Sequence, residues 1–173
     1  VAFLALDGTS VGRALQAQGT LGEYAALSSK LLAAFDWQVL RQGMDRRVLP
    51  LLRGGDDLLL AFGAGKETFD LVIDLVQRVA EGLQPLGIGL GAGLVVSSSL
   101  PARQACELAQ RLLSSAKADA RTRGLDVALD FELVQQGSMV ALEVDVLRGE
   151  SRQVSVAFGP LAPVGGNLAL GWR

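Results

Sequence analysis

A glycine-rich acidic turn between two apolar runs is the feature that most limits the folds open to this chain. Residues 48–62 read VLPLLRGGDDLLLAF, in which a Gly-Gly-Asp turn separates the apolar stretches 46–53 and 57–62. Glycine and aspartate in a short connection between apolar segments are typical of a tight β-hairpin. Pro50 cannot donate a ladder hydrogen bond, which favours an edge strand or a bulge. The middle of the chain is therefore predicted to form two antiparallel strands.

The segments around this hairpin alternate between strand and helix patterns. Strand-like apolar runs occupy 1–6, 87–96 and 125–134, and helical spacing occupies 9–41, 66–83 and 101–124. The order β-α-β-β-α-β-α-β begins like a ferredoxin-like split βαβ unit. We expect an α+β domain over residues 1–134, with a central antiparallel sheet, helices on one face, and an added helix and strand.

Residues 135–173 are expected to add a C-terminal β extension packed on the same domain. The stretches 139–147 and 152–158 alternate apolar and polar residues around an Arg-Gly-Glu turn, which predicts a second hairpin.

Four glycines alternate along the predicted strand 87–96, at positions 87, 89, 91 and 93. A period of two leaves one strand face without side chains. The spacing does not match a dinucleotide-binding fingerprint, and strand rather than helix follows it. The pattern indicates close packing of a helix on the sheet.

Composition excludes several kinds of chemistry. The chain has one cysteine and no histidine, which argues against disulfide scaffolds, zinc sites of the Cys/His type and histidine-based catalysis. Cys106 lies in a helical pattern and is expected in the core. The net charge of −2 disfavours a broad nucleic-acid surface. No apolar run predicts a membrane span and no signal peptide is visible, so we expect a cytoplasmic protein. The start at Val1, inside an apolar run and without Met, is expected of a piece of a longer protein.

Three carboxylates fall at predicted strand ends. Asp7 ends the first strand, and Asp56 and Asp57 lie at the hairpin tip. Strands one and three of a split βαβ sheet are neighbours, so these side chains can meet at one edge. Clustered carboxylates suit a hard cation, and Mg²⁺ binds one or two of them together with water and phosphate oxygens. This arrangement fits phosphoryl transfer to a sugar hydroxyl.

Two glycines and a lysine complete the predicted site. Gly54 and Gly55 would let a nucleotide lie against the backbone, and the ammonium of Lys117 could reach a phosphate. Alone, a Gly-Gly-Asp-Asp turn is explained by hairpin conformation, and a lone lysine by solvation. The conjunction of Asp7, the hairpin and Lys117 favours a functional site.

The motifs resemble the palm (nucleotidyl cyclase) domain of the large subunit of type III CRISPR effector complexes and the minimal CRISPR polymerases. More distantly they are similar to GGDEF diguanylate cyclases. The matching stretches are FLALDGTSVG (3–12), LSSKLLAAF (27–35), VLPLLRGGDDLLLAF (48–62) and GAGLVVSSSLPARQACELAQRLLSSAKADAR (91–121). The resemblance covers roughly residues 1–134. It implies a ferredoxin-like palm that makes cyclic oligonucleotide second messengers from ATP, with Mg²⁺ or Mn²⁺, in antiviral defence. It also implies a homodimer or a second palm, and other defence-complex subunits, as partners.

The resemblance assigns roles to individual residues. Asp7, Asp56 and Asp57 correspond to catalytic metal ligands, with the Gly8 carbonyl beside the first. Nucleotide contacts correspond to Gly54, Gly55, Lys117 and, more weakly, Ser28 near the base pocket.

Two positions depart from the family pattern. Thr9 stands where the family usually has Asp, and Ser10 where Asn is common. A hydroxyl can hydrogen-bond a metal-bound water but supplies no charge. Two readings therefore stay open, an active cyclase and a palm that binds nucleotide or scaffolds without turnover. The departure of GGDD from GGDEF argues against cyclic di-GMP synthesis. The acidic pI disfavours a third reading, an RNA-contacting palm.

Overall fold

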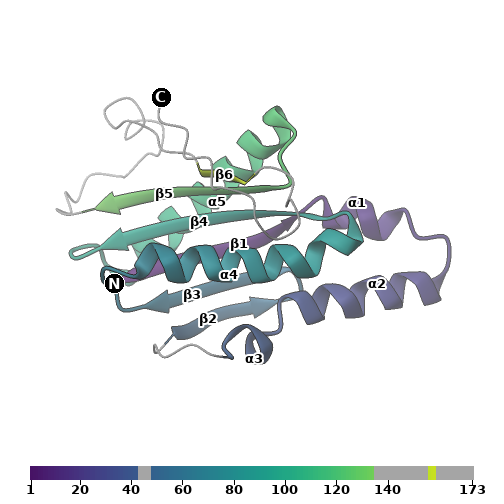
Figure 1. Cartoon of the computed structure of the whole chain (residues 1–173), viewed down its shortest axis with the longest axis horizontal. Helices are drawn as coiled ribbons and strands as arrows, with labels where there is room; N and C mark the ends of the chain where they lie inside the picture. The colour runs from purple at the N-terminus through teal and green to yellow at the C-terminus, as the bar shows by residue number, and fades with distance from the viewer. Residues whose placement is uncertain (43–47, 135–155, 159–173) are drawn as a thin grey trace.

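The computed structural model describes residues 1–42, 48–134 and 156–158, and these residues form one sheet flanked by helices. The six strands run in the order β2-β3-β1-β4-β5-β6 (Figure 1). The elements are β1 (Ala2–Thr9), α1 (Val11–Gln16), α2 (Leu21–Ala34), α3 (Trp37–Leu40), β2 (Val48–Gly54), β3 (Asp57–Phe62), α4 (Thr68–Leu83), the 3₁₀ turn η1 (Gln84–Leu86), β4 (Gly89–Ser97), α5 (Ala102–Arg123), β5 (Val127–Val134) and β6 (Val156–Phe158). The α+β class is confirmed.

The predicted central hairpin is present as β2 and β3. Its tip is a tight turn in which Gly55 adopts a left-handed conformation with φ of 61°. Such a φ favours glycine because a Cβ would be strained there. Among the described strands, β2 pairs only with β3, and its register shifts between Pro50 and Leu52. Pro50 therefore lies on an edge strand beside a bulge, as predicted.

β1 occupies the middle of the sheet, antiparallel to both β3 and β4. The predicted adjacency of the first and third strands is confirmed. β1 continues two residues beyond Asp7, however, so Asp7 does not end the strand. Its last pair joins Thr9 to Gly89, where the missing side chain leaves room for the threonine hydroxyl.

The long helical pattern over 9–41 folds as three helices rather than one. Thr20 caps α2 in a capping box, in which Glu23 N–H donates to Thr20 Oγ1 at 3.2 Å and Thr20 N–H donates to Glu23 Oε2 at 3.0 Å. Asp36 caps α3 by accepting from Gln38 N–H at 2.8 Å. Both caps satisfy amide groups that a helix start leaves unpaired. Helical periodicity alone does not reveal such interruptions.

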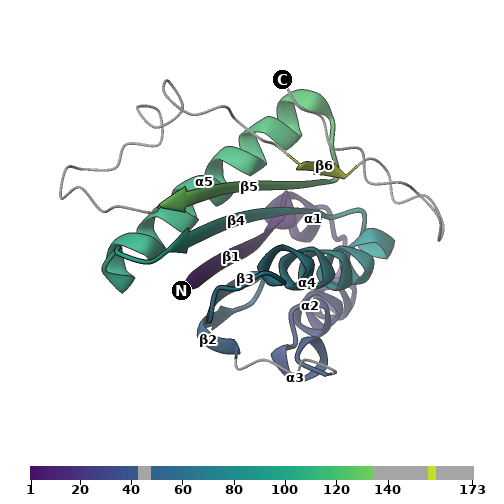
Figure 2. The same ribbon diagram turned by 60° about the vertical axis from the view of Figure 1, so that its left-hand side comes forward.

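Helices cover both faces of the sheet (Figure 2). α2 and α4 pack on the face that carries Leu4, Leu6 and Leu60, as expected for the split βαβ core. The added helix α5 covers the opposite face, where it packs with Phe3 and Ala5. The expectation of helices on one face therefore holds for the core and not for α5. Because α5 links the parallel pair β4 and β5, the sheet is also not wholly antiparallel.

Two of the four alternating glycines, Gly91 and Gly93, lie beneath α5, whereas Gly87 comes before β4 and a Cβ on Gly89 would meet Asp126 and Thr9. A Cβ on Gly93 would lie 2.1 Å from the carbonyl oxygen of Ala109, and one on Gly91 would lie 2.5 Å from Lys117 Cγ. Real Cβ atoms do not approach so closely, so only glycine lets the helix pack at this distance. The predicted close packing of helix on sheet is confirmed.

The C-terminal region is described in part. Within the predicted strand 152–158, β6 pairs antiparallel with the start of β5. The other arm of the predicted hairpin, 139–147, lies outside the described residues, and the boundary at 134 remains a prediction. Cys106, expected in the core, is only partly buried and packs against the buried cluster that contains Phe3 and Ala5. Within the described ranges, none of the helices is both apolar and long enough to traverse a bilayer.

Candidate functional site

The sheet register brings the predicted carboxylates together. Asp7 on β1 is the direct cross-strand partner of Asp57 on β3. Asp56 precedes Asp57 at the turn, and its carbonyl oxygen accepts from Gly8 N–H at 3.4 Å. Side chains alternate along a strand, so Asp7 shares the α5 face with Phe3 and Ala5. The acidic residues therefore meet where the hairpin tip adjoins the α5 face.

Lys117 enters this cluster from α5. Its ammonium donates to the Oδ2 atom of Asp7 and forms an ion pair with it. The two side chains are only 16% and 22% exposed, respectively. Partial burial strengthens such a pair relative to one in open solvent. In this structure Lys117 is thus the counter-charge of Asp7.

The local environment disfavours charge on two of the carboxyls. The pKa of Asp7 is raised, with burial as the largest single cause; the hydrogen bond and charge of Lys117 lower it, and the charges of Asp57 and Asp56 raise it. The pKa of Asp57 is raised mainly by burial and then by Asp56, with Lys117 opposing. Repulsion among carboxylates is what a bound cation would relieve.

Asp57→Asn is expected to stabilise the fold at neutral pH. A carboxyl whose pKa is raised on folding binds its proton more tightly in the native state, so stability falls as pH rises from the unfolded pKa through the folded one. The expected gain at pH 7 is about 0.5 kcal/mol, small because Asp57 is exposed. Thermal unfolding should show the gain at pH 7 and its disappearance near about pH 3, where both forms are neutral. A variant less stable than wild type at pH 7 would contradict the raised pKa of Asp57.

The remaining predicted site residues lie in three different environments. Gly54 and Gly55 are exposed, and a Cβ on either would meet no atom within 4 Å, so space for a ligand lies beside the turn. Gly8 is tightly surrounded, since a Cβ there would lie 2.6 Å from Val11 Cγ2. Ser28 lies in α2, which packs on the α4 face, so the structure does not bring it to Asp7 and Lys117.

A hollow of about 290 Å³ lies at the end of β1, two residues beyond Asp7, and it includes residues that the sequence analysis did not single out. Thr9 lines it together with Arg121 and Asp126. Arg121 follows Lys117 by four residues on α5, so the two cations lie one turn apart along one helix face. This four-residue spacing is visible in the sequence and could have pointed to Arg121. The hollow offers hydroxyl, guanidinium and carboxylate groups to a polar ligand.

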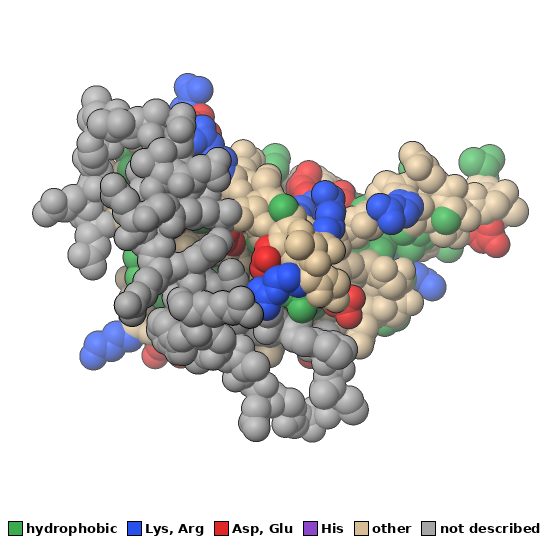
Figure 3. All heavy atoms as spheres, turned by 90° about the horizontal axis from the view of Figure 1, so that it is seen from above, with side chains coloured by type: hydrophobic (Ala, Val, Ile, Leu, Met, Phe, Trp, Pro, Cys, Tyr) green, Lys and Arg blue, Asp and Glu red, His purple; other side chains and the backbone are tan. Residues whose placement is uncertain are grey.

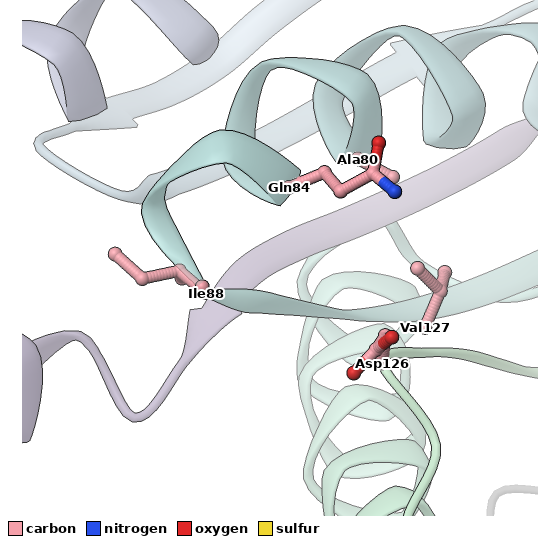
Figure 4. Close-up of a pocket in the computed structure, with 6 residues that line it drawn as sticks. Ala80, Gln84, Ile88, Asp126 and Val127 are labelled. Atoms are coloured by element: carbon pink, nitrogen blue, oxygen red, sulfur yellow. The ribbon is translucent and has the colours of Figure 1, made fainter. Parts of the chain in front are cut away.

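A second hollow of about 100 Å³ shares Gly87 and Asp126 with the first. Figure 4 shows Ala80 and Gln84 lining it from α4 and its end, and Asp126 and Val127 from the start of β5. The two hollows together lie at the end of the sheet where β1 ends and where β4 and β5 begin.

Ser10, between Thr9 and α1, has a strained backbone. Its φ of 65° is the only positive φ among the described non-glycine residues. The left-handed conformation costs a side-chain-bearing residue about 1–2 kcal/mol. The strain falls directly beside the candidate site, as is common for functional turns.

Ser10→Gly is therefore expected to raise the free energy of unfolding by about 0.5 kcal/mol, because relief of strain is partly offset by the greater freedom of glycine in the unfolded chain. Urea denaturation measures the gain. Ser99→Gly is the matched control, since Ser99 is exposed and its φ is not positive. An equal effect of both substitutions would argue against strain at Ser10.

The carboxylates of this site could supply only some of the ligands of a metal ion, and other molecules would have to supply the rest. Over residues 1–42, 48–134 and 156–158, no group of three or more Asp, Glu, Cys or His side chains is placed to hold a metal ion. Asp7 and Asp57 nevertheless present hard carboxylate oxygens from paired positions. Mg²⁺ commonly takes one or two carboxylates and completes its shell with water and phosphate oxygens. The residues fit a cation whose remaining ligands are water or phosphate oxygens.

Solved structures share this fold. A Csm1–Csm4 cassette in complex with cA4 matches with a TM-score of 0.60 and 14% identity, over 81% of this chain and 21% of that chain. A Csm1–Csm4 cassette with one ATP matches at 0.54 and 14%, over 68% and 19%. An EAL/GGDEF domain protein from M. capsulatus matches at 0.50 and 17%, over 76% and 83%. The chain thus spans about a fifth of the Csm1–Csm4 chains it matches.

Sequence comparison identifies the family. No curated protein matches the chain significantly. The family model described as Cas10/Cmr2, second palm domain, matches residues 1–124, which contain β1 to α5 and every predicted site residue. The resemblance inferred from the motifs is confirmed, and the chain belongs to the Cas10/Cmr2 second palm domain family.

Proposed function

We propose that this palm is a metal-dependent nucleotidyltransferase that makes cyclic oligonucleotides from ATP in a type III CRISPR defence complex. The observation that carries the proposal is the meeting of Asp7, Asp57 and Lys117 beside the open Gly54–Gly55 turn. Two carboxylates and an ammonium at one accessible edge suit a cation and a triphosphate together. The family match supports the same reading.

The reaction joins the sugar hydroxyl of one nucleotide to the α-phosphorus of another. The bond to pyrophosphate breaks, and the hydroxyl proton passes to solvent. When bound, a divalent metal ion would activate the hydroxyl and neutralise charge on the triphosphate. Asp7, Asp56 and Asp57 supply carboxylate oxygens, and Lys117 holds a phosphate oxygen. The exposed Gly54–Gly55 backbone accommodates the nucleotide.

The partners are inferred from the relatives. The two Csm1–Csm4 structures contain cA4 and ATP, respectively. A second palm, or a second copy of this chain, would supply the other nucleotide, and further subunits of a defence complex would surround it. A broad nucleic-acid contact is disfavoured, because basic and acidic side chains lie intermixed on the described surface seen in Figure 3.

A catalytically inactive palm is the second candidate, and Thr9 favours it. Where the first motif of the family usually has its second Asp, Thr9 lines the hollow beside Arg121 with a neutral hydroxyl. Such a palm would bind nucleotide or scaffold the complex without turnover.

A product assay separates the two candidates. The full-length protein that contains this chain is incubated with ATP and Mg²⁺ or Mn²⁺, and cyclic products are sought by chromatography and mass spectrometry. Cyclic oligoadenylate is the expected result. ATP binding without product under both metals would favour the inactive palm. Thr9→Asp is the matched variant, since product formed by this variant and not by wild type would identify Thr9 as the cause.

A further inference from the structure

Lys117 on α5 reaches Asp7 on β1 by passing over Gly91 of β4. Gly91 is the register partner of Asp7 in the β1–β4 ladder. A Cβ at position 91 would lie 2.5 Å from Lys117 Cγ and 3.0 Å from Leu113 Cδ1. The aliphatic stem of Lys117 therefore occupies the space that a side chain on residue 91 would fill.

A Cβ on residue 91 would meet Lys117 at Cγ, and this position determines how much of the lysine side chain must move. Cγ lies near the root of the side chain, so a clash there redirects the whole stem and not only the ammonium. Lys117 is 16% exposed in the structure, with its ammonium on Asp7. Rotation of the stem away from residue 91 would carry the ammonium away from Asp7 and break the ion pair.

We propose that Gly91 is a positioning residue of the site, which keeps open the passage through which Lys117 reaches Asp7. Gly91 acts through Lys117 and has no direct role in the chemistry. The inference rests on the proposed function only in its effect on nucleotide, since the position of Lys117 can be measured without any ligand.

Under this proposal, Gly91 and Gly93, the two alternating glycines beneath α5, have different roles. Gly93 lies under the backbone of α5, where a Cβ would meet Ala109 and Leu113 main-chain atoms. Gly91 lies under side chains. Gly93 therefore sets the distance between helix and sheet, whereas Gly91 sets the course of one functional side chain.

Chemical acylation of lysines tests the position directly. The metal-free and nucleotide-free full-length protein is treated briefly with an acetylating reagent, and modified lysines are quantified by mass spectrometry. In Gly91→Ala, Lys117 is expected to react about tenfold faster than in wild type, because its charge-assisted hydrogen bond is lost. Lys30 and Lys66 are exposed and serve as internal references whose rates stay unchanged.

A stability-matched control separates positioning from general loosening of the fold. Leu112→Ala removes buried volume from α5 without adding an atom at position 91, and it should leave the reactivity of Lys117 unchanged. Unchanged reactivity in folded Gly91→Ala, or an equal increase in Leu112→Ala, would overturn the proposal. If Gly91→Ala does not fold, Gly91→Ala with Leu113→Ala removes one of the two contacts and keeps the one with Lys117.

ATP affinity provides the second readout. Lys117→Met and Gly91→Ala are each expected to weaken ATP binding by about tenfold. In the Lys117→Met background, Gly91→Ala should have no further effect, because the residue on which it acts is gone. Additive losses would overturn the proposal. Absence of cyclic product from wild type would instead contradict the proposed function. It would not affect the acylation test of Gly91, because that test uses no metal or nucleotide.

Discussion

Replacement of Asp56 and Asp57 together by Asn is expected to lower cyclic product formation by at least about a thousandfold, which corresponds to roughly 4 kcal/mol of lost transition-state stabilisation. The amides keep the shape of the hairpin but remove two negative charges from its tip. Asp57 is the cross-strand partner of Asp7, so the substitution leaves one carboxylate of the cluster in place. Product from ATP, measured against enzyme concentration, checks the loss.

The control for this variant carries two Asp→Asn changes elsewhere. Asp70 and Asp74 lie on α4, which covers the opposite face of the sheet from Lys117. Asp70→Asn with Asp74→Asn should keep full activity, although it removes the exposed pair between Asp74 and Arg78. Product unchanged by the Asp56 and Asp57 substitutions would place the chemistry at another site.

The stability of the double variant gives an independent check. Burial and mutual repulsion raise the pKa of Asp57, so removal of its charge should not destabilise the fold. A loss of activity together with equal or higher stability is the expected pattern for residues selected for function. A loss of both would attribute the effect to misfolding.

Much of the fold follows from local sequence chemistry. The Gly-Gly-Asp turn and Pro50 predict the edge hairpin. The sequence pattern does not show where one helical pattern breaks into three, because a gap of a few residues barely disturbs the period. It also does not show which face α5 covers, since an apolar stripe reports burial and not the partner surface.

The candidate site illustrates the same division. Asp7, the acidic hairpin and Lys117 are found by motif and order, and the structure brings them together. The role of Gly91 requires the β1–β4 register, which depends on contacts between distant segments. Ser28 shows the opposite case, in which a motif match does not correspond to proximity in the structure. In both cases the sequence does not show which distant segments of the chain lie side by side.

Gly93→Ala is expected to cost about 3 kcal/mol of the free energy of unfolding, the upper part of the range for overpacking substitutions. The added Cβ would lie 2.1 Å from the carbonyl oxygen of Ala109 and 2.3 Å from the amide nitrogen of Leu113. Both atoms are helix backbone, so no side-chain rotation can relieve the contact, and α5 must move away from the sheet. That movement opens the buried cluster in which Leu108 and Leu112 lie.

Comparison of three glycines in urea denaturation makes this prediction specific. Gly63→Ala adds a methyl group where no atom lies within 4 Å, so its effect should stay within about 0.5 kcal/mol. Gly91→Ala meets side chains and should cost less than Gly93→Ala, which meets backbone. The expected order of losses is therefore Gly93, then Gly91, then Gly63. A loss at Gly93 no larger than that at Gly63 would mean that α5 does not pack closely on β4, and Lys117 would then have no fixed path to Asp7.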